Sequence, residues 1–207
     1  MTGRSFSLTP FPAPNIADIS ITGDISLQEN IIHLRYLLTG KFDDVFVPPA
    51  SMTPSRKDEL WRTTCFEFFL AVKDQPQYWE FNMSPSGDWN VYRMDAYRRI
   101  GFREETFIEG LPFEFQKSRV AGSWQSEPGQ NEARGCELEA RVDLHPILQP
   151  DQLFEFGIIA IIQTKDGNET YWALAHPAPF ADFHLRESFI LELAGKTPRS
   201  QQSVAGD

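Results

Sequence analysis

The chain has 207 residues and a formal net charge of −10, and 41% of its residues are hydrophobic. This length is enough to bury a core within one large domain. The negative charge argues against nucleic acid or an anionic membrane surface as a partner. The 17 phenylalanines and 15 prolines are typical of short strands joined by turns, which favours an all-β protein.

The beginning of the chain shows no targeting signal. Residues 1–14 lack the apolar stretch of a secretory signal peptide, and no apolar run in the sequence is long enough to span a membrane. We therefore expect a cytoplasmic protein. In that reducing compartment Cys65 and Cys136 are expected to be buried thiols, with a single disulfide between them as the alternative.

Two short apolar runs, at residues 16–21 and 31–39, are predicted to be the first strands of the chain. Between them the triplet Thr22-Gly23-Asp24 combines residues that favour turns. The sequence therefore predicts two separate strands on either side of this triplet.

A meander of three antiparallel strands is predicted in the centre of the chain, at residues 64–72, 78–84 and 89–95. Strand side chains alternate between faces, so Glu67 interrupts a face that is otherwise apolar and needs a partner or water there. Only about one helical turn fits before the first of these strands. Trp61 and Arg62 are therefore expected on a loop or short turn at its mouth.

The second half of the chain is predicted to contribute five more strands, at residues 113–120, 136–144, 153–163, 170–176 and 189–193. The third of these is apolar throughout, as in a central strand that is covered on both faces. Residues 165–168 then predict a hairpin turn. Together the elements predict a single antiparallel β-sandwich with little helix over residues 1–194, followed by a disordered tail at 195–207.

Four segments, TCFEFFL, YWEFNMSPSGDWNVYR, YWALAHP and DFH, resemble the DOMON-like proteins, within the broader group related to family 9 carbohydrate-binding modules. The resemblance covers roughly residues 5 to 194, the span of the predicted core strands. It implies a jelly-roll-like sandwich whose relatives bind sugars or haem. The chain departs from the pattern at Ala181, where a proline is expected before the Asp-Phe-His triplet.

Aromatic and polar side chains in these segments suit a carbohydrate, because a sugar ring packs on an aromatic face while its hydroxyls need polar partners. By resemblance, Trp61 matches a binding tryptophan of family 9 modules and Trp172 supplies a second platform, although strand alternation alone would bury Trp172. The sequence predicts a non-catalytic domain that binds a carbohydrate or a sugar-containing cell-wall precursor. The candidate ligand-binding residues are Trp61, Arg62, Glu67, Asn82, Trp89, Tyr92, Arg98, Trp172, His176 and His184.

Three other interpretations stay open. A haem-binding domain could use Met83 or Met94 with His176 as an axial pair, but no C-x-x-C-H motif for covalent attachment is present. An enzyme acting on sugars could use Glu67 and Glu80 as paired carboxylates. His176, Asp182 and His184 could surround a zinc ion, but no third strong ligand is evident beside the two histidines. No metal or cofactor is therefore predicted.

Overall fold

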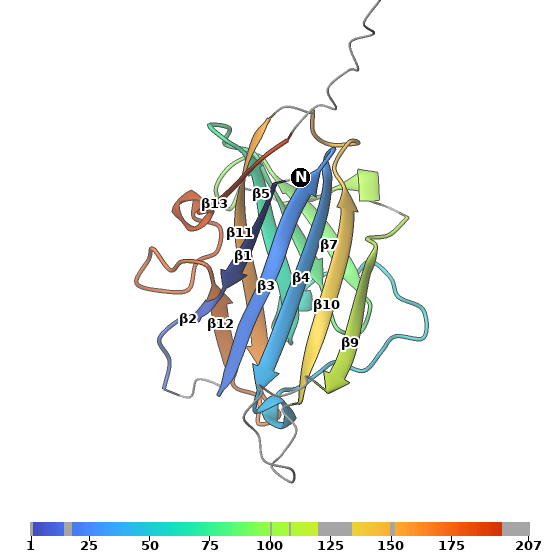
Figure 1. The fold of residues 1–207 in the computed structure, drawn as a ribbon, viewed down its shortest axis with the longest axis vertical. Coiled ribbons are helices and arrows are strands. Elements are labelled where there is room, and N and C mark those ends of the chain that lie inside the picture. Colours follow the sequence, from blue (N-terminus) through green and yellow to red (C-terminus); the bar gives the residue numbers. More distant parts are fainter. Residues whose placement is uncertain are drawn as a thin grey trace, which may run out of the picture.

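The structure is a computed structural model that describes residues 2–14, 18–99, 101–107, 109–119, 134–149 and 152–195. It is a sandwich of two antiparallel β-sheets, and Figure 1 shows the smaller sheet in front of the larger one. The smaller sheet contains, in spatial order, β1 (Thr2–Ser7), β3 (Ile19–Gln28), β4 (Ile31–Gly40), β10 (Arg134–Asp143) and β9 (Phe113–Arg119).

The larger sheet has eight strands, with β13 paired to β11 beside the main path. In spatial order the main path contains β2 (Thr9–Pro10), β12 (Glu169–Ala173), β11 (Leu153–Gln163), β5 (Cys65–Val72), β6 (Tyr78–Met83), β7 (Trp89–Met94) and β8 (Phe102–Arg103). β13 spans Leu191–Ala194. The predicted all-β sandwich is confirmed.

The helices of the described residues are four short 3-10 turns of three residues each. None of them is long and apolar enough to cross a membrane. They are η1 (Phe42–Asp44), η2 (Leu60–Arg62), η3 (Glu105–Phe107) and η4 (Arg186–Ser188).

The main core lies between the two sheets and is built by strand alternation. Phe66, Phe68 and Leu70 of β5 point into it, while Phe69 and Ala71 point to the opposite face of the same strand. That opposite face is covered by the segment after β12, so β5 and β11 are buried on both sides. The prediction of a central strand at residues 153–163 is thereby confirmed.

One prediction near the N-terminus was wrong. Residues Thr22-Gly23-Asp24 do not form a turn but lie inside β3, which pairs with β1 on one side and β4 on the other. The chain turns instead at Glu29 and Asn30, whose φ angles of 49° and 59° fit the two-residue hairpin between β3 and β4. Glycine at position 23 serves close packing, since a Cβ there would lie 2.5 Å from Cζ of Phe6.

Strand boundaries elsewhere differ by a few residues, and β1 was not predicted. β12 ends at Ala173, three residues before the predicted end, so His176 lies in a loop. Cys65 and Cys136 are both buried and form no disulfide. Residues 15–17, residue 120 and the predicted tail beyond Gly195 lie outside the described residues.

Candidate functional site

A cavity of about 650 Å³ opens on the outer face of the larger sheet. Its floor comes from β5 and β6, where Glu67 and Glu80 lie on the same face as Tyr92 of β7. Aromatic side chains form its walls, and a cation and an imidazole complete it. These surrounding residues are Trp61, Tyr92, Tyr171, Phe183, Arg98 and His184.

Trp61 forms one wall because a 3-10 turn lifts it out of the sheet just before β5. Glu59, with φ at 58°, begins this turn, and the Trp61 side chain remains 37% exposed. Its indole meets the Tyr92 ring edge-on, with centroids 6.0 Å apart. Tyr92 is fixed in turn, because its hydroxyl donates a hydrogen bond to Asp58 Oδ1 at 2.7 Å. The cavity therefore presents a supported aromatic surface at its mouth.

The two carboxyl groups of the floor are both buried, Glu67 being 2% and Glu80 5% exposed. Burial, and then the neighbouring Glu80 charge, raises the pKa of Glu67 well above its ordinary value. Burial also raises the pKa of Glu80 to about 7, although a hydrogen bond from Asn82 Nδ2 to Oε1 (2.9 Å) opposes this. At neutral pH Glu80 is therefore close to half ionised, while Glu67 holds its proton more tightly than an ordinary glutamate does.

Among the described residues no cation contributes to the pKa of Glu67, and its Oε1 atom is buried without a hydrogen-bond partner, although the Cys65 thiol interacts with the carboxyl group. A buried polar atom of this kind costs free energy unless a water or ligand satisfies it. The backbone behind it is well held, since the Tyr36 hydroxyl donates to the Glu67 carbonyl at 2.6 Å across the core. Glu67, which carries this unpartnered oxygen, thus lies on a rigid floor and is one of the residues that line the cavity.

Arg98 and His184 come from two different segments and meet beside Glu80. Arg98 Nη2 pairs with Asp182 Oδ1 at 3.0 Å, and half of its side chain stays exposed. Nδ1 of His184 lies 2.9 Å from the Tyr78 hydroxyl, and its Nε2 lies 4.0 Å from Glu80 Oε2. Burial, and then the Arg98 charge, lowers the pKa of His184 to about 4, so its imidazole is neutral at pH 7.

Half of the predicted ligand-binding residues line this cavity, and the other half do not. Five line it: Trp61, Glu67, Tyr92, Arg98 and His184. Asn82 is fully buried beneath it and orients Glu80. Arg62 points into solvent, where it pairs with Glu59 at 2.9 Å.

Trp89 and Trp172 were expected to face a ligand, and the structure places both in the core between the sheets instead. Trp89 is 6% and Trp172 3% exposed, because each occupies a strand position that points inward. His176 also lies away from the cavity lining, with Nε2 donating to the Thr9 carbonyl at 2.9 Å. Tyr171, one residue before Trp172, lines the cavity and was missed. Alternation along β12 would have identified it once Trp172 was assigned to the core.

The metal and haem arrangements are not assembled in the part of the chain that is described. No group of three or more His, Cys, Asp or Glu there could hold a metal ion. Asp182, one of the three candidate zinc ligands, instead accepts hydrogen bonds from Tyr97 and Arg98. Met83 is buried in the main core, and Met94 lines the cavity without His176 beside it.

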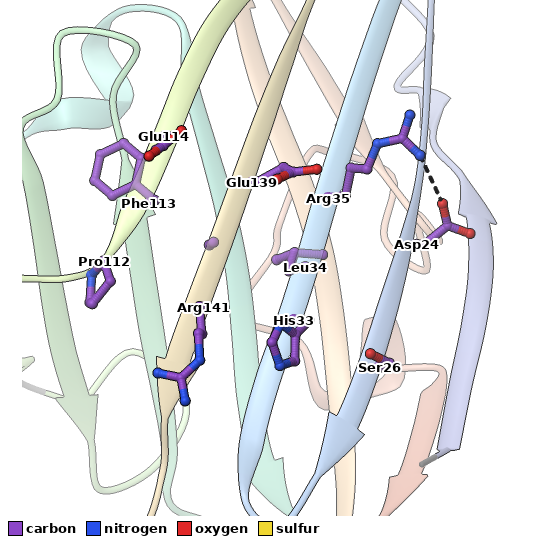
Figure 2. Close-up of a pocket in the computed structure, with 11 residues that line it drawn as sticks. Asp24, Ser26, His33, Leu34, Arg35, Pro112, Phe113, Glu114, Glu139 and Arg141 are labelled. Atoms are coloured by element: carbon purple, nitrogen blue, oxygen red, sulfur yellow. Dashed lines mark ion pairs between the residues drawn. The ribbon is translucent and has the colours of Figure 1, made fainter.

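A second cavity, of about 700 Å³, lies on the outer face of the smaller sheet. Figure 2 shows that its lining side chains project from β3, β4, β9 and β10 and, in the case of Pro112, from the residue before β9. Charges there compensate one another, as where Arg35 Nη1 lies 3.5 Å from Asp24 Oδ2. No buried polar atom without a partner belongs to the described lining of this second cavity. It is therefore the weaker candidate.

No family model matches the chain, and no curated protein matches it significantly in sequence. Among solved structures, a candidate carbohydrate-binding protein from Bacteroides uniformis is 14% identical over 89% of this chain and 84% of its own, with a TM-score of 0.59. A family 9 carbohydrate-binding module from Caldicellulosiruptor kristjanssonii, solved with cellotriose and with glucose, gives TM-scores of 0.43 and 0.44 at 13% and 12% identity. Those two matches cover 94% and 91% of this chain and 83% and 82% of the module chains. The structural neighbours are thus carbohydrate-binding proteins that include family 9 modules, and the first supports the β-sandwich fold.

Proposed function

We propose that the cavity on the larger sheet binds a carbohydrate and that the protein is a non-catalytic binding domain. The observation that carries this proposal is Glu67 Oε1, a buried oxygen without a partner, on the floor of a cavity whose mouth holds the exposed Trp61. An apolar face beside unsatisfied hydrogen-bonding groups is the combination that a sugar ring requires.

The charge state of the floor favours a neutral, hydroxyl-rich ligand over an ion. Neutral His184 offers hydrogen bonds without a net charge, and the raised pKa of Glu67 favours its uncharged form as well. Arg98 is the cation of the lining, and Asp182 already compensates it. Hydroxyl groups can both donate to and accept from such partners, so they satisfy the site without burying an uncompensated charge. Sugar-containing cell-wall precursors belong to the same chemical class.

The fold similarity is consistent with this proposal, since one protein that shares the sandwich is a candidate carbohydrate-binding protein. The resemblance of the sequence segments to DOMON-like proteins is a separate prediction, and haem remains its alternative ligand. A Soret band in the purified protein would favour haem over sugar.

The decisive experiment screens the protein on a glycan array that includes glucose, cello-oligosaccharides and cell-wall fragments, followed by calorimetric titration of the best ligand. Trp61→Ala should weaken binding by about 2 kcal/mol, the scale of an aromatic hot spot. Its free energy of unfolding should change by less than about 1 kcal/mol, because the residue lies outside the sheets. Phe102→Ala is the matched control, as Phe102 is exposed but does not line the cavity. Absence of any sugar binding, or equal binding by Trp61→Ala, would refute the proposal.

One observation favours a second candidate function, an enzyme that acts on sugars. A carboxyl group with a pKa of about 7, such as Glu80, is suited to proton transfer at neutral pH. Glu67 would then act as the acid and Glu80 as the base. Release of product from array ligands that disappears in both Glu67→Gln and Glu80→Gln would establish the enzyme. Binding without turnover would leave the binding domain as the function.

A further inference from the structure

Asp182 lies outside the predicted and observed lining of the cavity, yet it connects two segments that surround it. Its side chain is fully buried and receives three hydrogen bonds. The Tyr97 hydroxyl donates at 2.5 Å and Arg98 Nη2 at 3.0 Å, both from the segment after β7. The backbone N–H of His184 donates at 3.1 Å, from the loop after β12. The Asp182 carboxylate therefore holds the Arg98 side chain and the His184 backbone next to each other.

Arg98 depends on such support because its backbone is strained. Its φ of 48° is in the left-handed region, which costs a residue with a side chain about 1 kcal/mol. The ion pair with Asp182 holds the side chain, and the Arg98 N–H donates to the Tyr78 hydroxyl oxygen at 3.3 Å. Strained residues persist where the surroundings overdetermine them, and they cluster at ligand sites.

The same network fixes the tautomer of His184. The Tyr78 oxygen accepts from the Arg98 N–H, and the buried hydroxyl satisfies its own proton as well when it donates to His184 Nδ1, 2.9 Å away. The neutral imidazole then carries its proton on Nε2, which lies 4.0 Å from Glu80 Oε2. This separation is too long for a direct hydrogen bond. One hydroxyl oxygen can bridge it by accepting from His184 and donating to Glu80.

We infer that Asp182 is a positioning residue for the cavity, which holds Arg98 and, through Tyr78, presents the Nε2–H of His184 toward a ligand hydroxyl shared with Glu80. This inference rests on the proposed carbohydrate site. It deepens that proposal by requiring a ligand group that is both donor and acceptor.

The first experiment needs no ligand and records ¹⁵N spectra of the imidazoles in the free protein. The chain has four histidines, and a His184→Asn variant assigns the relevant signals. At pH 7 His184 should be the Nε2–H tautomer, and Asp182→Asn should shift it toward a mixture of both tautomers. Tyr97→Phe, which removes only an exposed donor to Asp182, should produce a smaller shift in the same direction. An Nδ1–H tautomer in the wild type, or identical spectra in Asp182→Asn, would overturn the inference.

The second experiment measures glucose binding, followed by tryptophan fluorescence, for Asp182→Asn, Arg98→Ala and the double variant. Each single variant should bind about tenfold more weakly, the scale of one hydrogen bond to a charged group. The double variant should lose less than the sum of the two single losses, because Asp182 acts in part through Arg98 and in part through the backbone N–H of His184. Asp166→Asn, at an exposed hairpin aspartate with its own hydrogen bonds, is the control. Wild-type affinity in Asp182→Asn, or additive losses, would contradict the positioning role. If the wild type binds no glucose, that result counts against the carbohydrate site, while the tautomer measurement still decides the role of Asp182.

Discussion

At the level of single residues, burial sets the charge states in the cavity. It raises the pKa values of Glu67 and Glu80 and lowers that of His184 to about 4. Burial therefore disfavours charge on the floor, which stays rich in hydrogen-bond donors and acceptors. The charged pair beside it, Arg98 and Asp182, compensates itself. A floor of this kind selects ligands by hydrogen-bond geometry rather than by charge.

The raised pKa of Glu80 predicts a pH-dependent stability. Burial raises it from 4.5 to about 7, so the folded state binds this proton more tightly than the unfolded chain does. The resulting stabilisation is fully present below pH 4.5 and is lost as the pH rises through about 7. Glu80→Gln, which is neutral at every pH, should therefore gain on the wild type by on the order of 2 kcal/mol between pH 5 and pH 8.

Urea unfolding of both proteins at several pH values measures this difference directly. The opposing contribution of His184, whose lowered pKa stabilises the fold as the pH rises from about 4, is present in both proteins and largely cancels. A difference between variant and wild type that stays constant from pH 5 to pH 8 would show that Glu80 does not titrate in this range.

At the level of elements, alternation along strands was the most reliable guide in the sequence. It separated the two faces of β5 correctly, and the absence of alternation identified β11 as covered on both sides. It failed at Gly23, because glycine marks a turn and a site of close packing equally well. Sequence alone does not show which of the two applies, since the contact with Phe6 joins residues from different strands.

Gly23→Ala tests this interpretation of β3. A Cβ at position 23 would lie 2.0 Å from the Arg35 carbonyl oxygen and 2.5 Å from Cζ of Phe6, and the first of these atoms is backbone in the neighbouring strand. The variant should lose about 2 kcal/mol or more of unfolding free energy, as overpacked cores do. Gly3→Ala is the control, because its nearest contact would be Ser26 Cβ at 3.3 Å. Equal urea midpoints for both variants would mean that β3 shifts at this position to accommodate the added methyl group.

In the candidate site, too, local sequence pattern predicted some residues correctly, whereas roles that depend on tertiary contacts could not be predicted. Trp61 was predicted on a short turn at the mouth of β5, and it forms a wall of the cavity. Trp172 was chosen by resemblance against its own strand alternation, and the alternation was the better guide. Asp182 could not be assigned a positioning role from sequence, because its partner Arg98 lies 84 residues away along the chain.

At the level of the whole molecule, the two sheets share one core. This core packs against the inner face of the larger sheet and so supports the strands that form the cavity floor. Tyr36 of the smaller sheet reaches across to the backbone of Glu67 at the cavity floor. The aromatic residues of both sheets contact each other there, as in the Tyr36–Phe66 pair with centroids 5.1 Å apart. A ligand bound on the outer face therefore rests on a layer that the opposite sheet supports.

This shared core predicts that the chain unfolds as a single unit. Trp79, Trp89 and Trp172 are buried in the core, so tryptophan fluorescence reports mainly on packing between the sheets. Far-ultraviolet circular dichroism reports on the strands of both sheets. Because the main core lies between the sheets and each sheet would expose its inner face without the other, the two signals should give the same urea midpoint and one transition. Trp61→Ala should leave that coincidence unchanged, since its indole lies outside the core. Two separate midpoints would mean that one sheet, together with the segment that covers its outer face, is stable alone, and the single domain predicted for residues 1–194 would then have to be divided.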